Sequence, residues 1–309
     1  MKSAPILVVG SFVQDLTFST ARFPSPGETV VGEFITGPGG KGSNQAVAAR
    51  RAGSEVIYVG AVGRDAFASE VRKFYQTEGI VAHLAEYAEK ATGTAGILFD
   101  ESGENEIVVA LGANADLSPS DISDDDVASA GLLVCQLECN LDAVADVMKR
   151  TGEKGIKRIL NPAPLRPDLP VELIHMADFL IPNESEFVAV LKKLGIESLP
   201  TDEIATLSGE ELDSLCRKVG TETVLVTLGG NGAHLSTENF WERIPAEEGV
   251  VPVDTTGAGD AFVGAFSAGL QRFDNDPLKA AQFANRAAAI SVTRKGTAPA
   301  MATLEEIEG

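Results

Sequence analysis

The glycine-rich segment 253–262 places a carboxylate just after two closely spaced glycines. Gly257 and Gly259 precede Asp260, and the small apolar stretch Val263–Leu270 that follows is typical of a buried helix. Free N–H groups at a helix start, together with the positive end of the helix dipole, bind phosphate oxygens. A carboxylate in the first turn of such a helix is placed to take a proton from an attacking hydroxyl group. The alternative is that Asp260 only caps the helix.

The sequence has no G-x-x-x-x-G-K-[ST] pattern, which is the phosphate-binding loop of one large class of nucleotide-binding enzymes. A phosphoryl-transfer enzyme with this sequence would therefore use a different architecture.

A second glycine cluster, residues 37–44, formally fits the pattern G-x-G-x-x-G. A dinucleotide-binding fingerprint needs a strand directly before it and an acidic residue on the next strand. Here Pro38 lies inside the motif, and the next apolar run, Ile57–Val62, has no acidic end. We interpret the cluster as a glycine turn that brings Lys41 and Asn44 next to a small polar ligand, since both side chains carry hydrogen-bond donors. An ordinary helix start with a flexible lysine is the alternative.

Polar or glycine-rich residues follow several apolar runs of the chain. They are found at residues 136–138, 161–164, 182–186 and 227–232. Ligands of open α/β sheets bind at the carboxyl ends of the strands. Any one of these segments could be a plain turn, but together they predict a ligand site at one edge of a sheet.

The elements that would position these residues alternate between strands and helices. Apolar runs that predict buried strands are Ile6–Val9, Ile57–Val62, Leu132–Leu137, Ile159–Leu160, Phe179–Ile181 and Val224–Leu228. Helical patterns lie between them, at Gln45–Ala52, Ala66–Gly79 and Asp142–Gly152. This alternation predicts an α/β fold with a doubly wound, mostly parallel sheet flanked by helices.

Two segments interrupt this rhythm, at about residues 15–37 and 92–112. Both contain short alternating stretches, which favour antiparallel strands that form one small protruding sheet, a candidate lid. A length of 309 residues would allow two domains. Because no interdomain linker is recognisable, we expect one domain over residues 1–309. The acidic run Asp121–Asp126 predicts a solvated loop or a helix start.

Charge and cysteine content exclude several classes of function. The formal net charge is −20, which disfavours binding to nucleic acids or to anionic membrane surfaces. Cys135, Cys139 and Cys216 have neither a disulfide framework nor zinc-site spacing. Together with the absence of a signal-peptide core in the opening residues, they predict a cytoplasmic protein with reduced, buried thiols.

The two glycine clusters together resemble the signatures of the ribokinase (PfkB) family of carbohydrate kinases. The first signature covers residues 39–46 with Ala49 and Gly53, and the second covers Asp254–Asp260. The resemblance extends from about residue 6 to residue 300, with both motifs in the family's order. It implies a ribokinase-like fold and the transfer of a phosphoryl group from ATP to the 5-hydroxyl of a pentose, D-ribose being the first candidate. It also implies Mg²⁺ or another divalent cation, and K⁺ as a monovalent activator.

The resemblance further implies a role for individual residues. Asp260 matches the general base, and the N–H groups of Gly257, Ala258 and Gly259 match an anion hole. The sugar would contact Val13, Asp15, Gly40, Lys41, Asn44, Glu138 and Asp260. ATP would contact Asn183, Thr227, Gly229, Gly232, Gly259 and Asn285, while Glu186 would be associated with Mg²⁺. The monovalent cation would be held near Asp254, Thr256, Ser291, Arg294 and Gly296, mostly through backbone oxygens.

Two departures from the family's pattern bear on the substrate and on the monovalent cation. Val13 stands where an asparagine is often found, and its apolar side chain cannot hydrogen-bond to a sugar hydroxyl, so 2-deoxyribose is an alternative substrate. Ala300 stands where a serine hydroxyl would help to hold the monovalent cation. Other sugars or nucleosides are further alternatives, and so is a catalytically silent sugar-binding regulator. The family's lid often forms a dimer contact, which implies a homodimer through the lid sheets.

Overall fold

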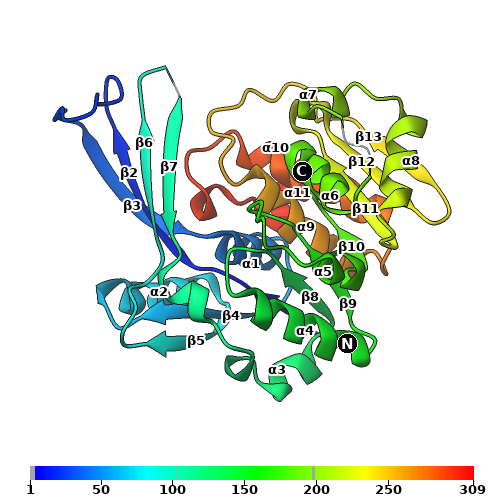
Figure 1. Cartoon of the computed structure of the whole chain (residues 1–309), viewed down its shortest axis with the longest axis horizontal. Coiled ribbons are helices and arrows are strands. Elements are labelled where there is room, and N and C mark those ends of the chain that lie inside the picture. The colour runs from blue at the N-terminus through cyan, green and yellow to red at the C-terminus, as the bar shows by residue number, and fades with distance from the viewer. Residues whose placement is uncertain (1–3, 103, 197–198) are drawn as a thin grey trace.

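The computed structural model describes residues 4–102, 104–196 and 199–309 and contains two β-sheets (Figure 1). Within these residues the large sheet has nine strands. In spatial order they are β13 (Trp241–Ile244), β12 (Ala233–Thr237), β11 (Thr223–Thr227), β10 (Phe179–Leu180), β9 (Lys157–Leu160), β8 (Leu132–Cys135), β1 (Ile6–Val9), β4 (Val56–Gly63) and β5 (Val81–Tyr87). All neighbouring pairs from β11 to β5 are parallel. The mostly parallel sheet expected from the sequence is therefore confirmed.

Helices cover both faces of this sheet because its central strands are apolar on both sides. In β1, Ile6 and Val8 pack into one core, whereas Leu7 and Val9 pack into the other. The first core includes residues of α1 (Lys41–Arg51), α2 (Ala66–Glu78), α9 (Ala258–Arg272), α10 (Pro277–Ser291) and α11 (Leu304–Glu308). The second includes residues of α3 (Asp124–Ser129), α4 (Leu141–Glu153), α5 (Val171–Met176), α6 (Glu184–Lys193), α7 (Thr201–Ile204) and α8 (Gly209–Lys218).

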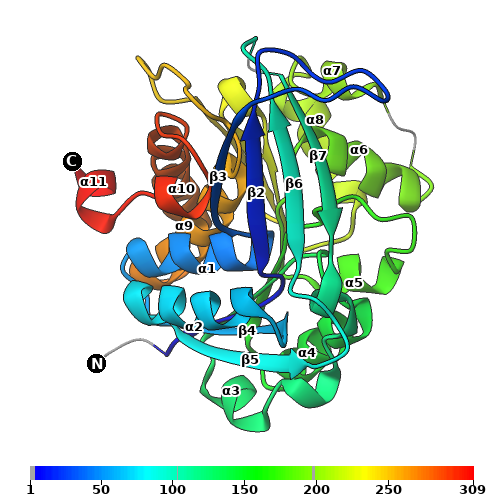
Figure 2. The ribbon, with the colours of Figure 1, turned by 90° about the vertical axis from the view of Figure 1, so that its left-hand side faces the viewer.

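The small sheet projects from the body of the molecule. Its order is β3 (Glu33–Gly39), β2 (Val13–Ser19), β6 (Thr94–Phe99) and β7 (Asn105–Ala110). The outer pairs are antiparallel, as expected, but the central pair is parallel, with Asp15 opposite Ala95. Figure 2 shows that the four-stranded sheet extends upward from the region of α1 and α2. The sheet begins at Val13, slightly before the expected segment, and the expected second segment includes residue 103, which lies outside the described residues.

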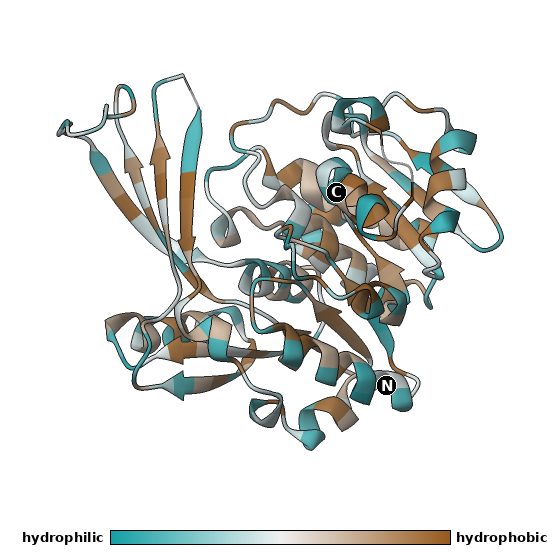
Figure 3. Ribbon diagram, in the orientation of Figure 1, coloured by the Kyte–Doolittle hydropathy of each residue, from teal (hydrophilic) through white to brown (hydrophobic). Residues whose placement is uncertain are grey.

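Apolar side chains are distributed differently in the two sheets. The small sheet buries a cluster of Val13, Ala95 and Ile97, while Phe34 and Val108 are exposed. Figure 3 shows hydrophobic residues along the small sheet as well as on the central strands. The small sheet therefore has apolar surface that the described residues of the chain do not cover.

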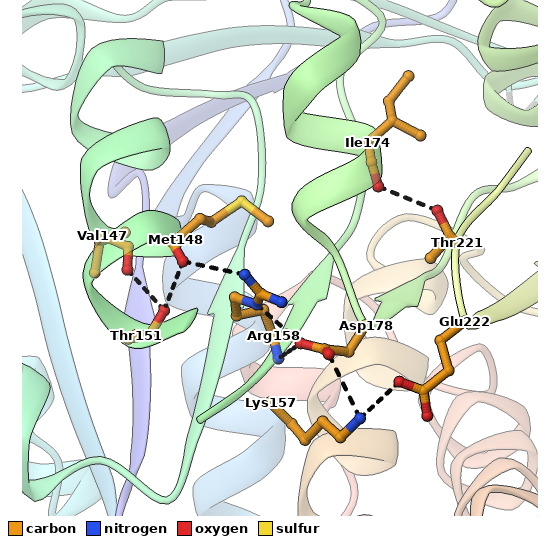
Figure 4. A network of polar contacts seen from close by, with 9 residues as sticks. All are labelled: Val147, Met148, Thr151, Lys157, Arg158, Ile174, Asp178, Thr221 and Glu222. Carbon is orange, nitrogen blue, oxygen red and sulfur yellow. Dashed lines mark hydrogen bonds and ion pairs between the residues drawn. The ribbon is translucent and has the colours of Figure 1, made fainter. Parts of the chain in front are cut away.

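Polar contacts tie the amino ends of neighbouring central strands together (Figure 4). The carboxylate of Asp178, just before β10, accepts hydrogen bonds from the backbone N–H of Arg158 at 2.8 Å and from its Nε at 2.9 Å. Lys157 forms ion pairs with Asp178 and with Glu222, which precedes β11. These contacts fix the register of β9, β10 and β11 at the end opposite the polar segments that follow the strands.

Three features differ from the sequence-based expectation or were missing from it. The sequence patterns did not indicate β5, nor the antiparallel strands β12 and β13. The helix start predicted at the acidic run is confirmed, because α3 begins at Asp124. The side chain of Asp126 is nevertheless buried, since its carboxylate accepts a hydrogen bond from Ser123 and contacts the His83 ring at 2.8 Å. Among the described residues, no helix combines the length and the apolar character that a membrane crossing requires.

Candidate active site

Two helices from opposite ends of the chain meet at the carboxyl edge of the large sheet. α1 begins after Gly40, whose φ of 89° lies in the left-handed region, and a Cβ on Gly40 would lie 2.6 Å from the backbone N of Val13. α9 packs directly on α1 at Gly264, where the helices are so close that a Cβ would lie 2.4 Å from the backbone oxygen of Gln45. Only glycine permits such close contacts, and they bring the first turns of α1 and α9 together.

The carboxylate of Asp260 lies in the first turn of α9 and is bound by two amides of α1. Asn44 donates from Nδ2 to Asp260 Oδ2 at 3.0 Å. Gln45 donates from Nε2 to Asp260 Oδ1 at 2.9 Å. Asp260 is only 7% exposed. The carboxylate is thus held in one orientation while one face remains at the edge of a cavity.

A second carboxylate, that of Glu138, is held at the start of α1. Its Oε2 accepts the backbone N–H of Lys41 at 2.9 Å and the hydroxyl of Ser11 at 2.5 Å. Asn44 also presents a buried Oδ1 that has no hydrogen-bond partner among the described residues. A buried, unpaired acceptor is costly, so a hydroxyl of a bound ligand would stabilise this arrangement.

The charges of this region perturb one another. Burial raises the pKa of Asp15 to about 7, with further contributions from the negative charges of Glu138 and Asp260 and an opposing hydrogen bond from Thr297. Burial alone would lower the pKa of Lys41, but the carboxylates of Asp260, Glu138 and Glu186 outweigh burial and raise it. The site therefore holds a charged ammonium group among several acidic side chains, as binding and catalytic sites often do.

A small cavity of about 130 Å³ lies between Asp260 and the ends of the central strands. It is lined by Lys41, Asn161, Ala163, Ile181, Asn183, Glu186, Thr227, Gly257, Gly259, Asp260 and Val263. Gly257 adopts φ 79° as the residue before α9. Of the three residues expected to form an anion hole, Ala258 donates its N–H to Thr255 O at 3.2 Å in this structure. The helix start nevertheless borders the cavity through Gly257 and Gly259.

Asn183 and Glu186 form the start of α6 and face the same cavity. Asn183 Oδ1 accepts the backbone N–H of Glu186, and Glu186 Oε2 accepts the backbone N–H of Asn183, each at 2.9 Å. Burial raises the pKa of Glu186. The described residues hold no cluster of three acidic, histidine or cysteine side chains that could bind a metal alone. A single carboxylate beside a phosphate site fits Mg²⁺, which keeps several waters and binds substrate phosphates.

A larger cavity of about 410 Å³ adjoins the small one. Its lining includes the predicted nucleotide contacts Asn183, Thr227, Gly229, Gly232, Gly259 and Asn285, together with Ala246, Val250, Pro252, Phe262 and Ala288. Gly232 has φ 82°, and a Cβ there would lie 2.0 Å from Ile244 O. Asn285 Nδ2 donates to Pro245 O at 2.9 Å. Much of the lining is apolar, as a site for a planar base would be.

The predicted monovalent-cation residues lie in the loop before α9, at the last residue of α10 and in the loop that follows α10. Asp254 joins the loops, because its carboxylate accepts the backbone N–H groups of Thr256 and Gly296, each at 2.9 Å. The backbone oxygen of Ser291 accepts the N–H of Arg294 at 3.2 Å. The side chain of Arg294 points elsewhere and forms an ion pair with Glu306. Any role for Arg294 at a cation is thus confined to its backbone.

Three polar residues of the site were missed from the sequence. Ser11 binds Glu138, Gln45 binds Asp260, and Thr297 donates to Asp15 Oδ2 at 3.4 Å and to Pro38 O at 3.3 Å. Gln45 and Thr297 are direct neighbours of Asn44 and Gly296, which were predicted. Their position next to a predicted ligand residue could have indicated Gln45 and Thr297, whereas no feature of the sequence indicated Ser11.

Val13 is buried in the small sheet, on the same face as Asp15 in the alternation of strand β2. Its neighbours in the apolar cluster are Ala95 and Ile97. Val13 therefore belongs to an apolar wall beside the carboxylate of Asp15.

Comparisons with known proteins agree with this arrangement. The model of the pfkB family carbohydrate kinases matches residues 3–304. Ribokinase of Schizosaccharomyces pombe is 36% identical, with 98% of this chain and 96% of that protein covered. Deoxyribokinase of Salmonella typhi is 35% identical, with 97% and 96% covered. The structure of Arabidopsis thaliana ribokinase complexed with ribose and ATP matches with a TM-score of 0.86 and 29% identity over 100% of this chain and 98% of that one.

These similarities extend over nearly the whole chain and include its ribokinase-like α/β fold. The chain belongs to the pfkB family of carbohydrate kinases.

Proposed function

We propose that the protein is a ribokinase, which transfers the γ-phosphoryl group of ATP to the 5-hydroxyl of D-ribose and forms ribose 5-phosphate and ADP. The observation that carries this proposal is the position of Asp260. Its carboxylate is fixed by two amides and borders a cavity that leads into the larger, nucleotide-sized cavity. A base at this junction would lie between a sugar on one side and the terminal phosphate of ATP on the other.

The chemical step follows from this placement. The 5-oxygen of ribose forms a bond to the γ-phosphorus while the bond from that phosphorus to the β-bridging oxygen breaks, and ADP keeps the electron pair. Asp260 accepts the proton of the 5-hydroxyl. Phosphoryl transfer depends mainly on positioning and on neutralising charge. N–H groups at the start of α9 and the ammonium group of Lys41 would supply part of that charge neutralisation.

Glu186 and Asn183 would arrange Mg²⁺ with its waters beside the phosphates. The bound ion would neutralise charge on the β- and γ-phosphates. Both residues border the small cavity, and Thr227, Gly229, Gly232 and Asn285 border the larger one, in which the nucleoside would lie.

The sugar would lie between the small sheet and α1. Carboxylates at Asp15 and Glu138, together with Asn44, would accept hydrogen bonds from its hydroxyl groups. The names of the relatives favour ribose, and one relative is a deoxyribokinase. 2-Deoxyribose is the second candidate, favoured by the apolar side chain of Val13 next to Asp15. The small sheet would act as a lid that excludes water from the sugar.

Three further assignments belong to the same proposal. K⁺ would bind near Asp254, Thr256, Ser291, Arg294 and Gly296 through backbone oxygens, since Asp254 already joins these loops. Exposed apolar residues of the small sheet would pack against a second copy of the chain. A cytoplasmic location would suit the three free, buried cysteines.

The test is ADP release with a panel of sugars and nucleosides, followed by Asp260→Asn. We expect ribose to give the highest kcat/KM. The variant should lose roughly 10²–10⁴-fold in kcat with nearly unchanged ATP affinity, because the amide cannot accept the proton. The Asp260 side chain makes no capping hydrogen bond to α9. An asparagine can accept from only one of the two amides that bind the carboxylate, so one buried hydrogen bond is lost and stability should fall by about 1–3 kcal/mol. Near-normal turnover of the variant would contradict the assignment of the base, and ATP binding without turnover of any sugar would favour a regulator.

A further inference from the structure

A chain of side-chain amides reaches Asp260 from the interior of the protein. Gln136, after β8, donates from Nε2 to Gln45 Oε1 at 2.6 Å. Gln45 Nε2 donates to Asp260 Oδ1 at 2.9 Å and to Asn161 Oδ1 at 3.1 Å. Asn161, after β9, donates from Nδ2 to Ile181 O at 2.8 Å. The chain thus connects the carboxyl ends of three central strands to the first turn of α9.

The partners of Gln45 determine the orientation of its amide group. Its oxygen faces the N–H donor of Gln136, and its nitrogen faces two oxygens, those of Asp260 and Asn161. A rotated amide would place its oxygen against the Asp260 carboxylate. It would lose its hydrogen bonds to Asp260 and Asn161 even if the Gln136 amide, whose Oε1 has no partner among the described residues, rotated with it. Gln45 is completely buried, and in a low-dielectric interior such unpaired polar groups are costly. Gln45 therefore has one stable orientation.

Gln45 differs from Asn44, the other amide bound to Asp260. Asn44 keeps a free Oδ1 for a ligand, whereas both polar atoms of Gln45 are used within the protein. Gln45 has no exposed surface at all, so none of its atoms is available to a bound substrate. Its position on Asp260 depends on the close packing of α1 on Gly264, one turn after Asp260. Gln45 can therefore affect a bound substrate only through Asp260.

From this geometry we infer that Gln45 is a positioning residue, which fixes the Asp260 carboxylate in the orientation that accepts the hydroxyl proton. This inference rests on the proposed role of Asp260 as the base. With Asn44 as its only partner, the carboxylate could still rotate about the hydrogen bond between Asn44 Nδ2 and Asp260 Oδ2. The hydrogen bond from Gln45 prevents this rotation. Because Gln45 is itself held by Gln136 and Asn161 at the strand ends, the Asp260 carboxylate is fixed relative to the sheet. Misplacing a reacting group by about 1 Å can cost ~10²-fold in rate.

The main test is Gln45→Met, which keeps the approximate volume of the side chain and removes its polar atoms. We expect kcat to fall by roughly 10- to 100-fold, while KM for ATP and for ribose changes less than about threefold, since no substrate contact is lost. Gln271→Met is the matched control. Gln271 lies at the other end of α9 and donates to Ala4 O while accepting from Ser54. The control variant loses two hydrogen bonds, one exposed and one partly buried, far from Asp260, and its kcat should stay normal.

A second variant, Gln45→Glu, decides the question if Gln45→Met fails to fold. It keeps the shape of the side chain but sets a second carboxyl group against Asp260 Oδ1. Two carboxyl groups at that distance share a proton, so the pH at which activity is lost on the acidic side should rise by about one unit or more. An unmoved acidic limb would overturn the inference, as would a Gln45→Met enzyme with normal kcat. If Asp260→Asn is strongly impaired in the same assay, either result removes only the role of Gln45 and leaves Asp260 as the base.

Discussion

Asp15→Asn should make the protein more stable at neutral and alkaline pH while it weakens the enzyme. Burial and the nearby charges of Glu138 and Asp260 raise the pKa of Asp15 from 3.8 to about 7 in the folded state. The folded protein therefore binds a proton that the unfolded chain releases near pH 4, so this group makes the free energy of unfolding fall as pH rises from about 4 to 7. Above pH 7 the folded state carries the full penalty of the buried charge.

The size of the effect follows from the pKa difference. One pKa unit corresponds to about 1.4 kcal/mol. Between pH 5 and pH 8 the wild-type protein should lose about 2–3 kcal/mol of stability through this group. In that interval Asp15 is already ionised in the unfolded chain, whereas in the folded protein it loses its proton only near pH 7. Asparagine has no such penalty. The free energy of unfolding of the variant, relative to wild type, should rise by that amount over the same interval.

Urea denaturation at pH 5 and pH 8, followed by far-UV circular dichroism, would measure this difference. Glu33→Gln, a carboxyl-to-amide change on the exposed strand β3 of the same sheet, is the control and should alter stability by less than about 0.5 kcal/mol at both pH values. The kcat/KM for ribose should fall in Asp15→Asn, since an acceptor for sugar hydroxyls is replaced. A stability difference between variant and wild type that is the same at pH 5 and pH 8 would refute the reasoning.

Two further predictions concern the departures from the family's pattern. Because Val13 belongs to an apolar wall, 2-deoxyribose should be phosphorylated within about 100-fold of ribose in kcat/KM, and Val13→Asn should shift the ratio toward ribose. Rejection of deoxyribose by about 10⁴-fold in the wild type would mean that another group recognises the 2-hydroxyl. Ala300 is buried and follows Gly296, a residue of the proposed K⁺ site, by four positions. Ala300→Ser should therefore lower the K⁺ concentration needed for half-maximal activity by offering a hydroxyl ligand. Identical K⁺ titrations of the two proteins would show that the side chain at this position does not reach the ion.

The central strands could be predicted because their environment leaves a strong trace in the sequence. Strands buried on both faces are continuous apolar runs, and β1, β4, β8 and β11 all show this pattern. Strand β5 lies at an edge and alternates between exposed and partly buried residues. His83 and Glu86 interrupt its apolar residues, so the segment shows no continuous apolar run, which is why no strand was expected there.

The candidate site could be predicted only in part, for a different reason. Glycine clusters and polar strand ends indicate which residues meet a ligand, because those patterns are local. The contact between Gln45 and Asp260 joins residues 215 positions apart, and it depends on how closely α1 approaches α9. Such contacts follow from packing, which a single sequence does not reveal. The same is true of Thr297, whose hydroxyl reaches Asp15 from a loop at the far end of the chain.

The distribution of charge explains how so acidic a chain can serve an anionic substrate. Among the described residues that line the two cavities, Lys41 is the only cation, and neighbouring carboxylates raise its pKa. The carboxylates of Asp15, Glu138 and Asp260 would face the sugar, a neutral molecule whose hydroxyl groups donate hydrogen bonds, so their charge favours its binding. Phosphate groups would instead meet the start of α9, where N–H groups and the helix dipole favour anions. With the proposed roles, the site would separate acceptors for the sugar from donors for the phosphates. Lys41 would then lie where the two meet, next to the proton and the phosphoryl group that are transferred.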